Sequence, residues 1–468
     1  MPQFEYDLVV IGSGPAGHSA AIAAAKLRRR VMVVERKSIV GGVCMNIGTI
    51  PSKTLREAVL YLSGYREHAL YGESYKVKEK IALADLLFRV EPVVRHEVDV
   101  TRHQLLRNNV ELVHAEASFI DPHRLRLFFE ERSGERIITA HKVVIAVGTE
   151  AARDPRMPLD GNCVFSSDDI LQLTDLPGSL AVIGAGVIGC EYASIFAALG
   201  VKVTIIEKHP RLLPFVDAEI IEALTYHLRE SRVTMRLGEE VDRVEQIADG
   251  TYPRVKINLV SGKQIIADKV LRSIGRSGAT AKLNLDGAGV KMDPRGRIKV
   301  NEVYQSEVDN IYAAGDVIGF PSLASTSREQ GRIAACHAFG LAAKHAPELF
   351  PYGIYTIPEI SFVGQNEEEL TAKGVPYEVG KAQYREIARG QIIGDTTGML
   401  KLLFERNTRE LLGVHVIGEG AVELVHIGQA VLSLKGKVDY FVDTVFNYPT
   451  LAECYKNAAF DGINRLQM

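Results

Sequence analysis

The 468-residue sequence has no excess of charge of either sign and no closely spaced cysteine pair. It contains 55 lysines and arginines against 58 acidic residues, a formal net charge of −3 at pH 7. This balance argues against a nucleic-acid-binding protein, because that class shows a basic excess or patch. The five cysteines are widely spaced, with no CxxC motif: Cys44, Cys163, Cys190, Cys336 and Cys454. Their odd number and spacing exclude a disulfide framework and a zinc site, and favour a reducing cytoplasm.

No basic and then apolar stretch precedes the first structural segment, so we expect no secretory signal peptide. Residues 179–200 are apolar and long enough to resemble a membrane span. They contain four glycines at the spacing of a strand-to-helix turn, and the charged Glu191. We therefore expect a buried strand followed by a buried helix. The chain length predicts two to four domains of an ordinary globular protein.

A strand, a glycine turn, a helix and a second strand occur in this order twice, over residues 6–35 and 179–207. In each copy an acid ends the second strand 23 residues after the first glycine (12 to 35, and 184 to 207). The residues of the pattern are Gly12, Gly14, Gly17 and Glu35 in the first copy, and Gly184, Gly186, Gly189 and Glu207 in the second.

A single GxGxxG motif is weak, but here it lies between strand and helix, precedes an acid and is repeated. The first glycine makes a tight turn, the second lets the backbone approach a pyrophosphate, and the third packs helix on strand. The helix N-terminus offers free N–H groups to the phosphates, and the acid accepts hydrogen bonds from a ribose. The alternative is a pair of ordinary turns with chance glycines. Two dinucleotide sites predict a flavin that exchanges electrons with a nicotinamide.

Three later segments indicate how the chain is organised. Residues 142–151 predict a buried strand that ends at Gly148 and leaves the first domain, and residues 269–278 repeat this pattern with Gly275. Residues 308–319 predict a strand followed by a helix that begins at Gly315 and Asp316. The Asp316 carboxylate either binds a sugar-like hydroxyl chain or caps the helix.

Beyond residue 350 the pattern changes. Residues 399–421 alternate like antiparallel strands joined by a polar turn, and residues 421–436 have helical spacing with an apolar face. This part of the chain predicts an α+β domain with a packing surface.

With these motifs in this order, the chain resembles the flavoprotein disulfide reductases, the family of lipoamide dehydrogenase, glutathione reductase and mercuric reductase. The resemblance covers essentially the whole chain. It implies an α/β fold with two Rossmann-like dinucleotide-binding domains, for FAD and NAD(P), and a C-terminal α+β interface domain that makes a homodimer. The expected boundaries are 1–150 for the FAD domain, 151–278 for the NAD(P) domain, 279–349 for the return to the FAD part, and 350–468 for the interface domain.

The resemblance also assigns residues. Gly12, Gly14, Gly17, Glu35 and Asp316 carry over to FAD, and Gly184, Gly186 and Gly189 to the nicotinamide nucleotide. Glu207, Gly42, Gly148, Lys208 and Gly275 complete the predicted cofactor-binding set, and no metal ligand is expected.

Two residues match the catalytic ion pair of the family. Lys53 in "IPSK" matches the lysine beside the flavin N5, and Glu191 matches its partner. An ammonium near N5 stabilises negative charge on the ring. The alternative is a solvated lysine and a buried glutamate with another partner.

The chain departs from this family at two places. The family pattern CxxxxC reads "CMNIGT" here, so Cys44 remains but Thr49 replaces the cysteine that faces the flavin. The family pattern HPTxxE reads "YPTLAE", so Tyr448 replaces the acid–base histidine while Glu453 keeps its spacing. A threonine forms no disulfide, and a tyrosine, with a pKa near ~10, is a poor proton shuttle at neutral pH. We expect Cys44 to be a small, inert buried residue.

Electrons on the flavin must therefore leave directly to a diffusible acceptor. The departing segments, "GTIPSK" and "FNYPT", resemble the soluble (Si-specific) pyridine nucleotide transhydrogenases, and this closer resemblance also runs end to end. It implies a cytoplasmic FAD oxidoreductase that catalyses NADPH + NAD⁺ ⇌ NADP⁺ + NADH by a ping-pong hydride transfer. It also implies a homodimer, with larger polymers in some members. Tyr448 and Glu453 are then expected to line the flavin site of the partner subunit.

Glu207 is the main difficulty for this interpretation, because a carboxylate there favours NAD and repels the 2′-phosphate of NADP. Lys208, His209 or Arg211 can reach a phosphate if Glu207 turns outward; the alternative is a solvated loop. If NADP binds poorly, the sequence favours an NAD(P)H-dependent quinone reductase or diaphorase. A dithiol enzyme and a non-catalytic FAD-binding module are two further classes. The first is disfavoured by Thr49 and Tyr448, the second by the intact Lys53 and Glu191.

Overall fold

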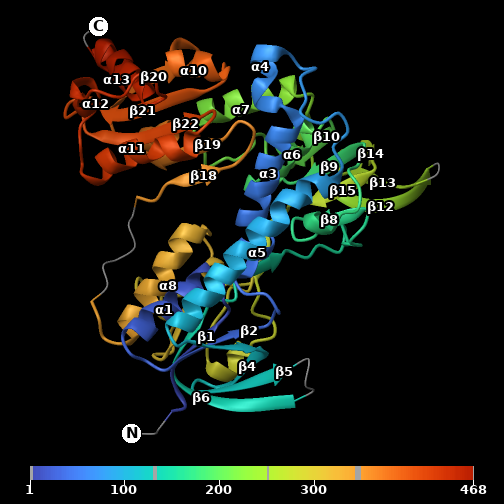
Figure 1. Ribbon diagram of the computed structural model, residues 1–468, viewed down its shortest axis with the longest axis vertical. Helices are drawn as coiled ribbons and strands as arrows, with labels where there is room; N and C mark the ends of the chain where they lie inside the picture. The colour runs from blue at the N-terminus through green and yellow to red at the C-terminus, as the bar shows by residue number, and fades with distance from the viewer. Residues whose placement is uncertain (1–3, 130–133, 250–251, 343–348, 467–468) are drawn as a thin grey trace. The chain divides into compact units, whose positions relative to one another are not determined.

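The computed structural model describes residues 4–129, 134–249, 252–342 and 349–466 (Figure 1). The chain forms two compact units, each built from three segments. The first unit contains residues 1–55, 87–152 and 275–347; the second contains residues 56–86, 153–274 and 348–468. Segment 56–86 thus groups with the second unit, whereas the boundaries expected from the sequence place it in the first domain.

The helices, with 3₁₀ turns written η, are α1 (Pro15–Lys26), α2 (Gly42–Asn46), α3 (Thr49–Ser63), η1 (Tyr65–Glu67), α4 (His68–Tyr71), α5 (Leu83–Arg107), η2 (Ile170–Gln172), α6 (Val187–Ala198), α7 (Ala218–Glu230), η3 (Leu285–Ala288), η4 (Asp316–Ile318), α8 (Ala324–Ala338), α9 (Glu367–Ala372), η5 (Tyr384–Glu386), α10 (Ala388–Ile393), α11 (Ala421–Ser433), α12 (Asp439–Asp443) and α13 (Glu453–Leu466).

The strands are β1 (Tyr6–Ile11), β2 (Val31–Glu35), β3 (Glu111–His114), β4 (Glu116–Asp121), β5 (Arg124–Phe129), β6 (Gly134–Ile145), β7 (Thr149–Ala151), β8 (Val164–Ser166), β9 (Ser179–Ile183), β10 (Lys202–Glu207), β11 (Thr234–Leu237), β12 (Val241–Asp249), β13 (Tyr252–Leu259), β14 (Gln264–Ala267), β15 (Lys269–Arg272), β16 (Arg276–Gly278), β17 (Ile311–Ala313), β18 (Tyr352–Ile354), β19 (Ile360–Gly364), β20 (Tyr377–Gln383), β21 (Met399–Glu405) and β22 (Leu411–Ile417).

The first unit is built on a seven-stranded sheet of order β3-β2-β1-β6-β5-β4, with β17 beside β6. Strands β3, β2, β1, β6 and β17 run parallel, and β4, β5 and β6 form an antiparallel meander. Residues 8–11 of β1 are buried, which is typical of a parallel strand covered on both faces. Helices α1 and α8 lie side by side in this unit (Figure 1). They approach closely because Gly331 of α8 faces the Ala16 backbone, where a Cβ would lie 2.0 Å from the Ala16 oxygen.

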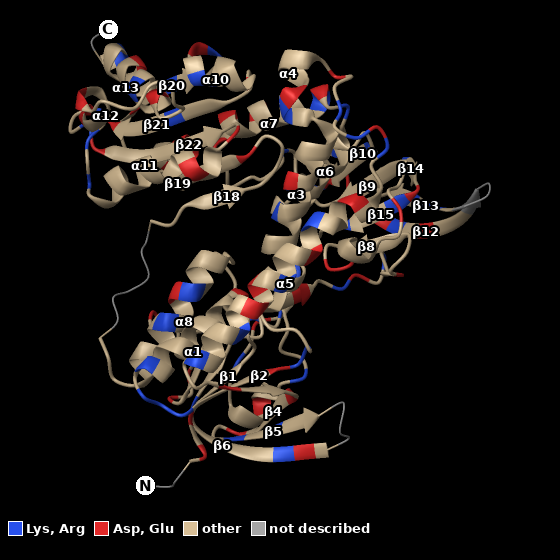
Figure 2. Ribbon diagram, viewed as in Figure 1, with Lys and Arg blue, Asp and Glu red and all other residues tan. Residues whose placement is uncertain are grey.

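The second unit repeats this plan with a five-stranded parallel sheet of order β11-β10-β9-β15-β8 and a three-stranded antiparallel sheet, β12-β13-β14. The apolar stretch 179–200 folds as β9 followed by α6, as the sequence predicts. Within the described residues, no helix is both long and apolar enough to cross a membrane. Charges of both signs are interspersed over the elements of each unit (Figure 2).

The C-terminal part of the second unit is a five-stranded antiparallel sheet, β18-β19-β22-β21-β20. Strands β21 and β22 form the predicted antiparallel pair, and α11 is the predicted helix. Helix α13 packs against β20 and β21 at a distance that only glycine allows, because a Cβ on Gly380 would lie 1.9 Å from the Ala458 oxygen.

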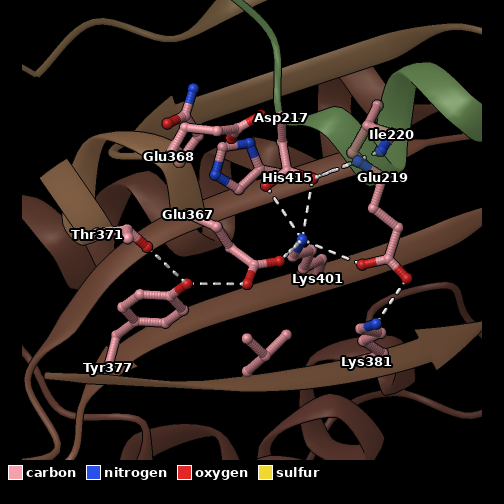
Figure 3. A network of polar contacts seen from close by, with 12 residues as sticks. Asp217, Glu219, Ile220, Glu367, Glu368, Thr371, Tyr377, Lys381, Lys401 and His415 are labelled. Atoms are coloured by element: carbon pink, nitrogen blue, oxygen red, sulfur yellow. Dashed lines mark hydrogen bonds and ion pairs between the residues drawn. The ribbon is translucent and has the colours of Figure 1, made fainter.

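Lys401 of β21 joins this sheet to the loop before α7 in the same unit (Figure 3). The lysine is fully buried, and its Nζ lies 2.9 Å and 3.0 Å from the two carboxylate oxygens of Asp217. It also contacts Glu219, at 3.0 Å, and Glu367 of α9. Burial alone would lower the pKa of Lys401, but these carboxylates outweigh it and raise the pKa. The ammonium therefore stays charged and holds the start of α7 on the C-terminal sheet.

Replacing Lys401 by methionine should destabilise the second unit by about 3 kcal/mol, since it leaves buried Asp217 without its cation. We expect calorimetry of the full chain to show a melting transition lowered by at least about 5 °C. Lys381→Met is the matched control, because that lysine pairs with Glu219 but is one-third exposed. It should cost under about 1 kcal/mol. Equal losses in the two variants would show that burial of Lys401 carries no special weight.

Candidate active site

The first glycine turn follows β1, and its backbone leaves no room for side chains at two positions. Gly12 has φ +102°, and a Cβ there would lie 2.4 Å from the Ala146 oxygen. A Cβ on Gly17 would lie 1.9 Å from the Gly12 oxygen, so this glycine lets α1 pack against the turn. The physical reasons expected for the first and third glycines are both present in the geometry.

Gly14 and Gly42 bring two backbone segments together at the N-terminus of α1. Gly42 has φ +61°, and a Cβ there would lie 2.9 Å from the Gly14 Cα. Gly14 precedes the first residue of α1, and no side chain caps this helix. The first N–H groups of α1 are therefore accessible for an anion, a cradle that fits a dinucleotide pyrophosphate.

The Glu35 carboxylate is bound into this glycine turn. One of its oxygens accepts hydrogen bonds from the Ser13 N–H, at 2.9 Å, and the Ser13 hydroxyl, at 2.6 Å. The other accepts the Lys37 N–H at 3.0 Å. The acid at the end of β2 thus lies against the residue between the first two glycines, where a ribose next to a pyrophosphate would meet it.

Asp316 belongs to the same unit and is the first residue of η4, preceded by Gly315. It opens a 3₁₀ turn, whereas the sequence indicates a helix, and Ser327 of α8 lies near its carboxylate. Burial raises the pKa of Asp316, which Arg276 and Ser327 offset in part. The Gln330 side chain accepts the Gly315 N–H at 2.8 Å and holds this turn beside α8.

The Thr49 hydroxyl lies near the Cys44 thiol. Burial raises the pKa of this thiol, and Thr49 and the nearby charges of Arg328 and Lys53 offset the rise only in part. Cys44 is half-buried, not fully buried as expected from the sequence. It is held as a neutral thiol beside a hydroxyl, without a partner sulfur, since all five cysteines are free.

Lys53 lies on α3 in the first unit, near Cys44, and Glu191 lies on α6 in the second unit. Their pairing therefore stays a prediction. Glu191 is 4% exposed, and one of its oxygens accepts the Tyr355 N–H at 2.8 Å. Ser194, one turn later on α6, accepts the Ile357 N–H at 3.0 Å. Helix α6 thus also anchors the segment that enters the C-terminal sheet.

The second glycine turn has the same geometry as the first. Gly184 has φ +99°, with a Cβ position 2.5 Å from the Ser273 oxygen. A Cβ on Gly189 would lie 2.0 Å from the Gly184 oxygen. A Cβ on Gly186 would meet nothing within 4 Å, so the space in front of α6 is open. This open N-terminus fits a second pyrophosphate.

Glu207 is bound into the second turn as Glu35 is into the first. Its carboxylate accepts the Ala185 N–H at 2.7 Å and the His209 N–H at 2.9 Å. The His209 ring adds a third hydrogen bond, from Nδ1, at 2.6 Å. Burial alone would raise the pKa of Glu207, but these N–H groups outweigh it and lower the pKa. The acid is therefore ionised at neutral pH.

Lys208 and Arg211, which follow Glu207 in the same loop, differ in their surroundings. Lys208 is exposed. Arg211 donates to Glu368 of α9, at 3.0 Å, and to the Pro214 oxygen.

Gly148 and Gly275 lie close to the two points where the chain leaves the first unit and returns to it. Both have positive φ, +64° and +112°, and a Cβ on either would meet nothing within 4 Å. The short strands that follow them, β7 and β16, pair with one another. Arg276 also donates to Thr149, at 2.8 Å to the hydroxyl and 2.9 Å to the carbonyl oxygen.

Tyr448 is 73% exposed. Glu453 begins α13, and one of its carboxylate oxygens is buried without a hydrogen-bond partner. Their expected place beside the partner subunit's flavin site stays a prediction.

Among the described residues, a cavity of about 1140 Å³ in the second unit contains none of the predicted site residues. Its lining comes from α3, the segment after it, the end of α6, the end of α7 and the α10 region.

Residues 6–331 match the family described as pyridine nucleotide-disulphide oxidoreductase, and residues 350–459 match its dimerisation domain. The chain belongs to this family. The family and the fold class that we expected from the sequence are therefore confirmed.

The chain is 55% identical over 463 residues to the soluble pyridine nucleotide transhydrogenase of Mycobacterium tuberculosis, covering 99% of this chain and 98% of that relative. It is 46% identical over 467 residues to the protein of the same name from Colwellia psychrerythraea, with 99% of each covered. Among solved structures, the HOCl-induced flavoprotein disulfide reductase RclA from Escherichia coli, as its Cu(II) complex, gives a TM-score of 0.88 at 28% identity, over 98% of this chain and 99% of that one. LpdA from Mycobacterium tuberculosis gives 0.88 at 26% identity, over 97% and 99%.

Sequence reasoning missed several contacts that position this family's site in the present chain. Ser13 was only the variable residue of GxGxxG, yet its hydroxyl binds Glu35. His209 was one of three loop cations, with no sign that its ring meets Glu207. Lys401 left one signal, a single lysine within an otherwise apolar strand.

Gly186→Ala and Gly189→Ala should separate nucleotide binding from folding. Gly186→Ala adds a methyl group in open space, so it should cost under about 1 kcal/mol of stability. The methyl group meets the approaching pyrophosphate, and we expect calorimetric titration to show NAD⁺ bound at least about tenfold more weakly. Gly189→Ala should instead lower the free energy of unfolding by about 3 kcal/mol, because the added methyl group overpacks the turn. Its melting temperature should fall accordingly. Unchanged NAD⁺ affinity in Gly186→Ala would contradict the assigned site.

Proposed function

We propose that the chain is an FAD-dependent soluble pyridine nucleotide transhydrogenase that catalyses NADPH + NAD⁺ ⇌ NADP⁺ + NADH. One observation carries the mechanism: Thr49 stands near Cys44 at the position where a disulfide reductase needs a second cysteine. Relatives at 46% and 55% identity over the full chain, named soluble pyridine nucleotide transhydrogenases, support the same activity.

The first unit would hold FAD, and its residues fit that group. The Gly14–Gly42 approach leaves the α1 N-terminus open to the pyrophosphate, and Glu35 accepts ribose hydroxyls. Asp316 accepts hydroxyls of the sugar-like chain. When bound, FAD supplies a ring that takes hydride from one reduced nicotinamide and gives it to another oxidised one.

The residues of this chain bind and orient the exchanging nucleotides. Gly186 leaves the α6 N-terminus open for each pyrophosphate in turn, and Glu207 meets the adenosine ribose. The Lys53 ammonium stabilises negative charge near the ring, and Glu191 pairs with it. Neither Tyr448 nor Glu453 moves a proton in this scheme, because a hydride exchange without thiols has no dithiol to protonate.

We also infer a homodimer, because residues 350–459 match a dimerisation domain. Tyr448 and Glu453 fall in that region and are proposed to line the partner's flavin site. Five free cysteines support a reducing, cytoplasmic location. The second candidate function is an NAD(P)H-dependent quinone reductase, which the fixed carboxylate of Glu207 favours if NADP(H) binds poorly.

The test is a two-step stopped-flow experiment on the purified holoprotein, recorded in the visible flavin band. NADPH and NADH should each bleach the band when mixed alone. The opposite oxidised nucleotide should then restore it, at a rate compatible with steady-state turnover. If NADH bleaches the band but NADPH does not, the transhydrogenase proposal is refuted and the quinone reductase proposal remains. Comparable turnover of lipoamide or oxidised glutathione would overturn both.

Cys44→Ser should keep transhydrogenation within about a factor of two, because serine is close to cysteine in size and no sulfur carries electrons in this scheme. Lys53→Met, a few residues away, should slow hydride transfer by about 100-fold through the loss of its charge. Steady-state assays of both variants, normalised to bound flavin, make the comparison. A large loss in Cys44→Ser would reveal a sulfur relay.

A further inference from the structure

A transhydrogenase must bind NADP(H) beside a carboxylate that repels its 2′-phosphate. Outward rotation of Glu207 would break its hydrogen bonds to the Ala185 N–H, the His209 N–H and the His209 ring. The side chain is only 11% exposed. The negative charge at this strand end is therefore a permanent feature of the site, and a cation must act with Glu207 in place.

Arg211 is already engaged. Its guanidinium donates to Glu368 at 3.0 Å and to the Pro214 oxygen. If Arg211 moved toward a phosphate, its ion pair with α9 would break. In this structure Arg211 therefore links the loop after β10 to α9.

His209 differs from Arg211 because it already lies on the ribose-binding acid. Its Nδ1 donates to Glu207 at 2.6 Å, and the side chain is 55% exposed. The first glycine site offers an internal comparison, since Lys37 stands two residues after Glu35 and gives only its backbone N–H. The second site keeps this backbone bond and adds a ring whose Nε2 is left for another partner.

We propose that His209 is the specificity-determining residue that lets one site accept both nucleotides. With NAD(H), neutral His209 orients Glu207 toward the ribose hydroxyls. With NADP(H), the imidazolium donates from Nδ1 to Glu207 and from Nε2 to the 2′-phosphate, so it offsets the carboxylate and binds the phosphate at once. Both roles use the same ring position. The inference rests on the proposed function, which requires both nucleotides.

Several charged groups lie at this end of the sheet. Glu239 lies beside the loop, because its N–H binds the Glu207 oxygen, while the Gly238 N–H binds the His209 oxygen. The charged groups on the loop and on the elements packed against it include Glu207, Lys208, Arg211, Asp217, Arg236 of β11, Glu239 with its partner Lys263, and Glu368.

The experiment measures binding of oxidised NADP⁺ and NAD⁺ to the full-length holoprotein by isothermal titration calorimetry. His209→Gln keeps a hydrogen-bonding side chain but removes the positive charge. We expect it to weaken NADP⁺ binding by about tenfold and NAD⁺ binding by no more than about twofold. His209→Lys should restore NADP⁺ binding. Arg229→Gln, which removes an exposed cation from α7, is the control and should change neither affinity.

The pH profile separates this role from a structural one. As the pH falls, wild-type affinity for NADP⁺ relative to NAD⁺ should rise, because the proposed bond from Nε2 to the 2′-phosphate requires the protonated ring. The 2′-phosphate titrates near pH ~6 as well, so the comparison that counts is the difference between the wild type and His209→Lys. In that variant the His209 share of the slope should vanish.

Equal weakening of both nucleotides in His209→Gln would overturn the proposal and leave His209 as a support for Glu207. Selective loss of NADP⁺ in Lys208→Gln, with His209→Gln unchanged, would also overturn it and assign the phosphate to Lys208. These titrations need no turnover. A protein that binds NADP⁺ through His209 but fails to exchange hydride would thus refute the proposed function and leave this inference standing.

Discussion

Each dinucleotide turn depends on a carboxylate that is bonded back into it. Glu35 and Glu207 end parallel strands, and each accepts the N–H of the residue between the first two glycines. The contact closes a small ring of backbone and side chain at the strand ends, with no space for a Cβ at the first and third glycines. The helix N-terminus and the acid at the strand end are thereby held in one geometry.

Loss of the second cysteine changes the chemistry without disturbing this frame. Thr49 occupies the first position of α3 and places a hydroxyl near Cys44 where a disulfide reductase has a second sulfur. Because burial keeps the thiol protonated, the sulfur is neither a nucleophile nor an electron carrier. The flavin site is then left to exchange hydride with ligands that reach it, which is the physical content of the transhydrogenase assignment.

The fold could be predicted because its signals are local. Glycine spacing, β-branched runs and the terminal acids predict both Rossmann units, and alternation predicts the strand pair β21–β22. The contacts that tune the site are not local in sequence. Tyr355 reaches Glu191 across 164 residues, and Lys401 reaches Asp217 across 184. No spacing rule encodes such pairs, since they exist only once separate sheets have packed. Burial of Lys401 follows from the carboxylates that meet it, not from its own strand.

The loop between β10 and α7 joins these two kinds of contact. At its start, Glu207 is bonded into the glycine turn, and at its end Asp217 caps α7 while binding Lys401 of the C-terminal sheet. Midway, Arg211 reaches Glu368, the neighbour of Glu367 in the Lys401 network (Figure 3). The loop is thus bonded to the rest of its unit at both ends and in the middle. The proposed discrimination between nucleotides uses a side chain that keeps its place in this loop, because the His209 ring is already bonded to Glu207.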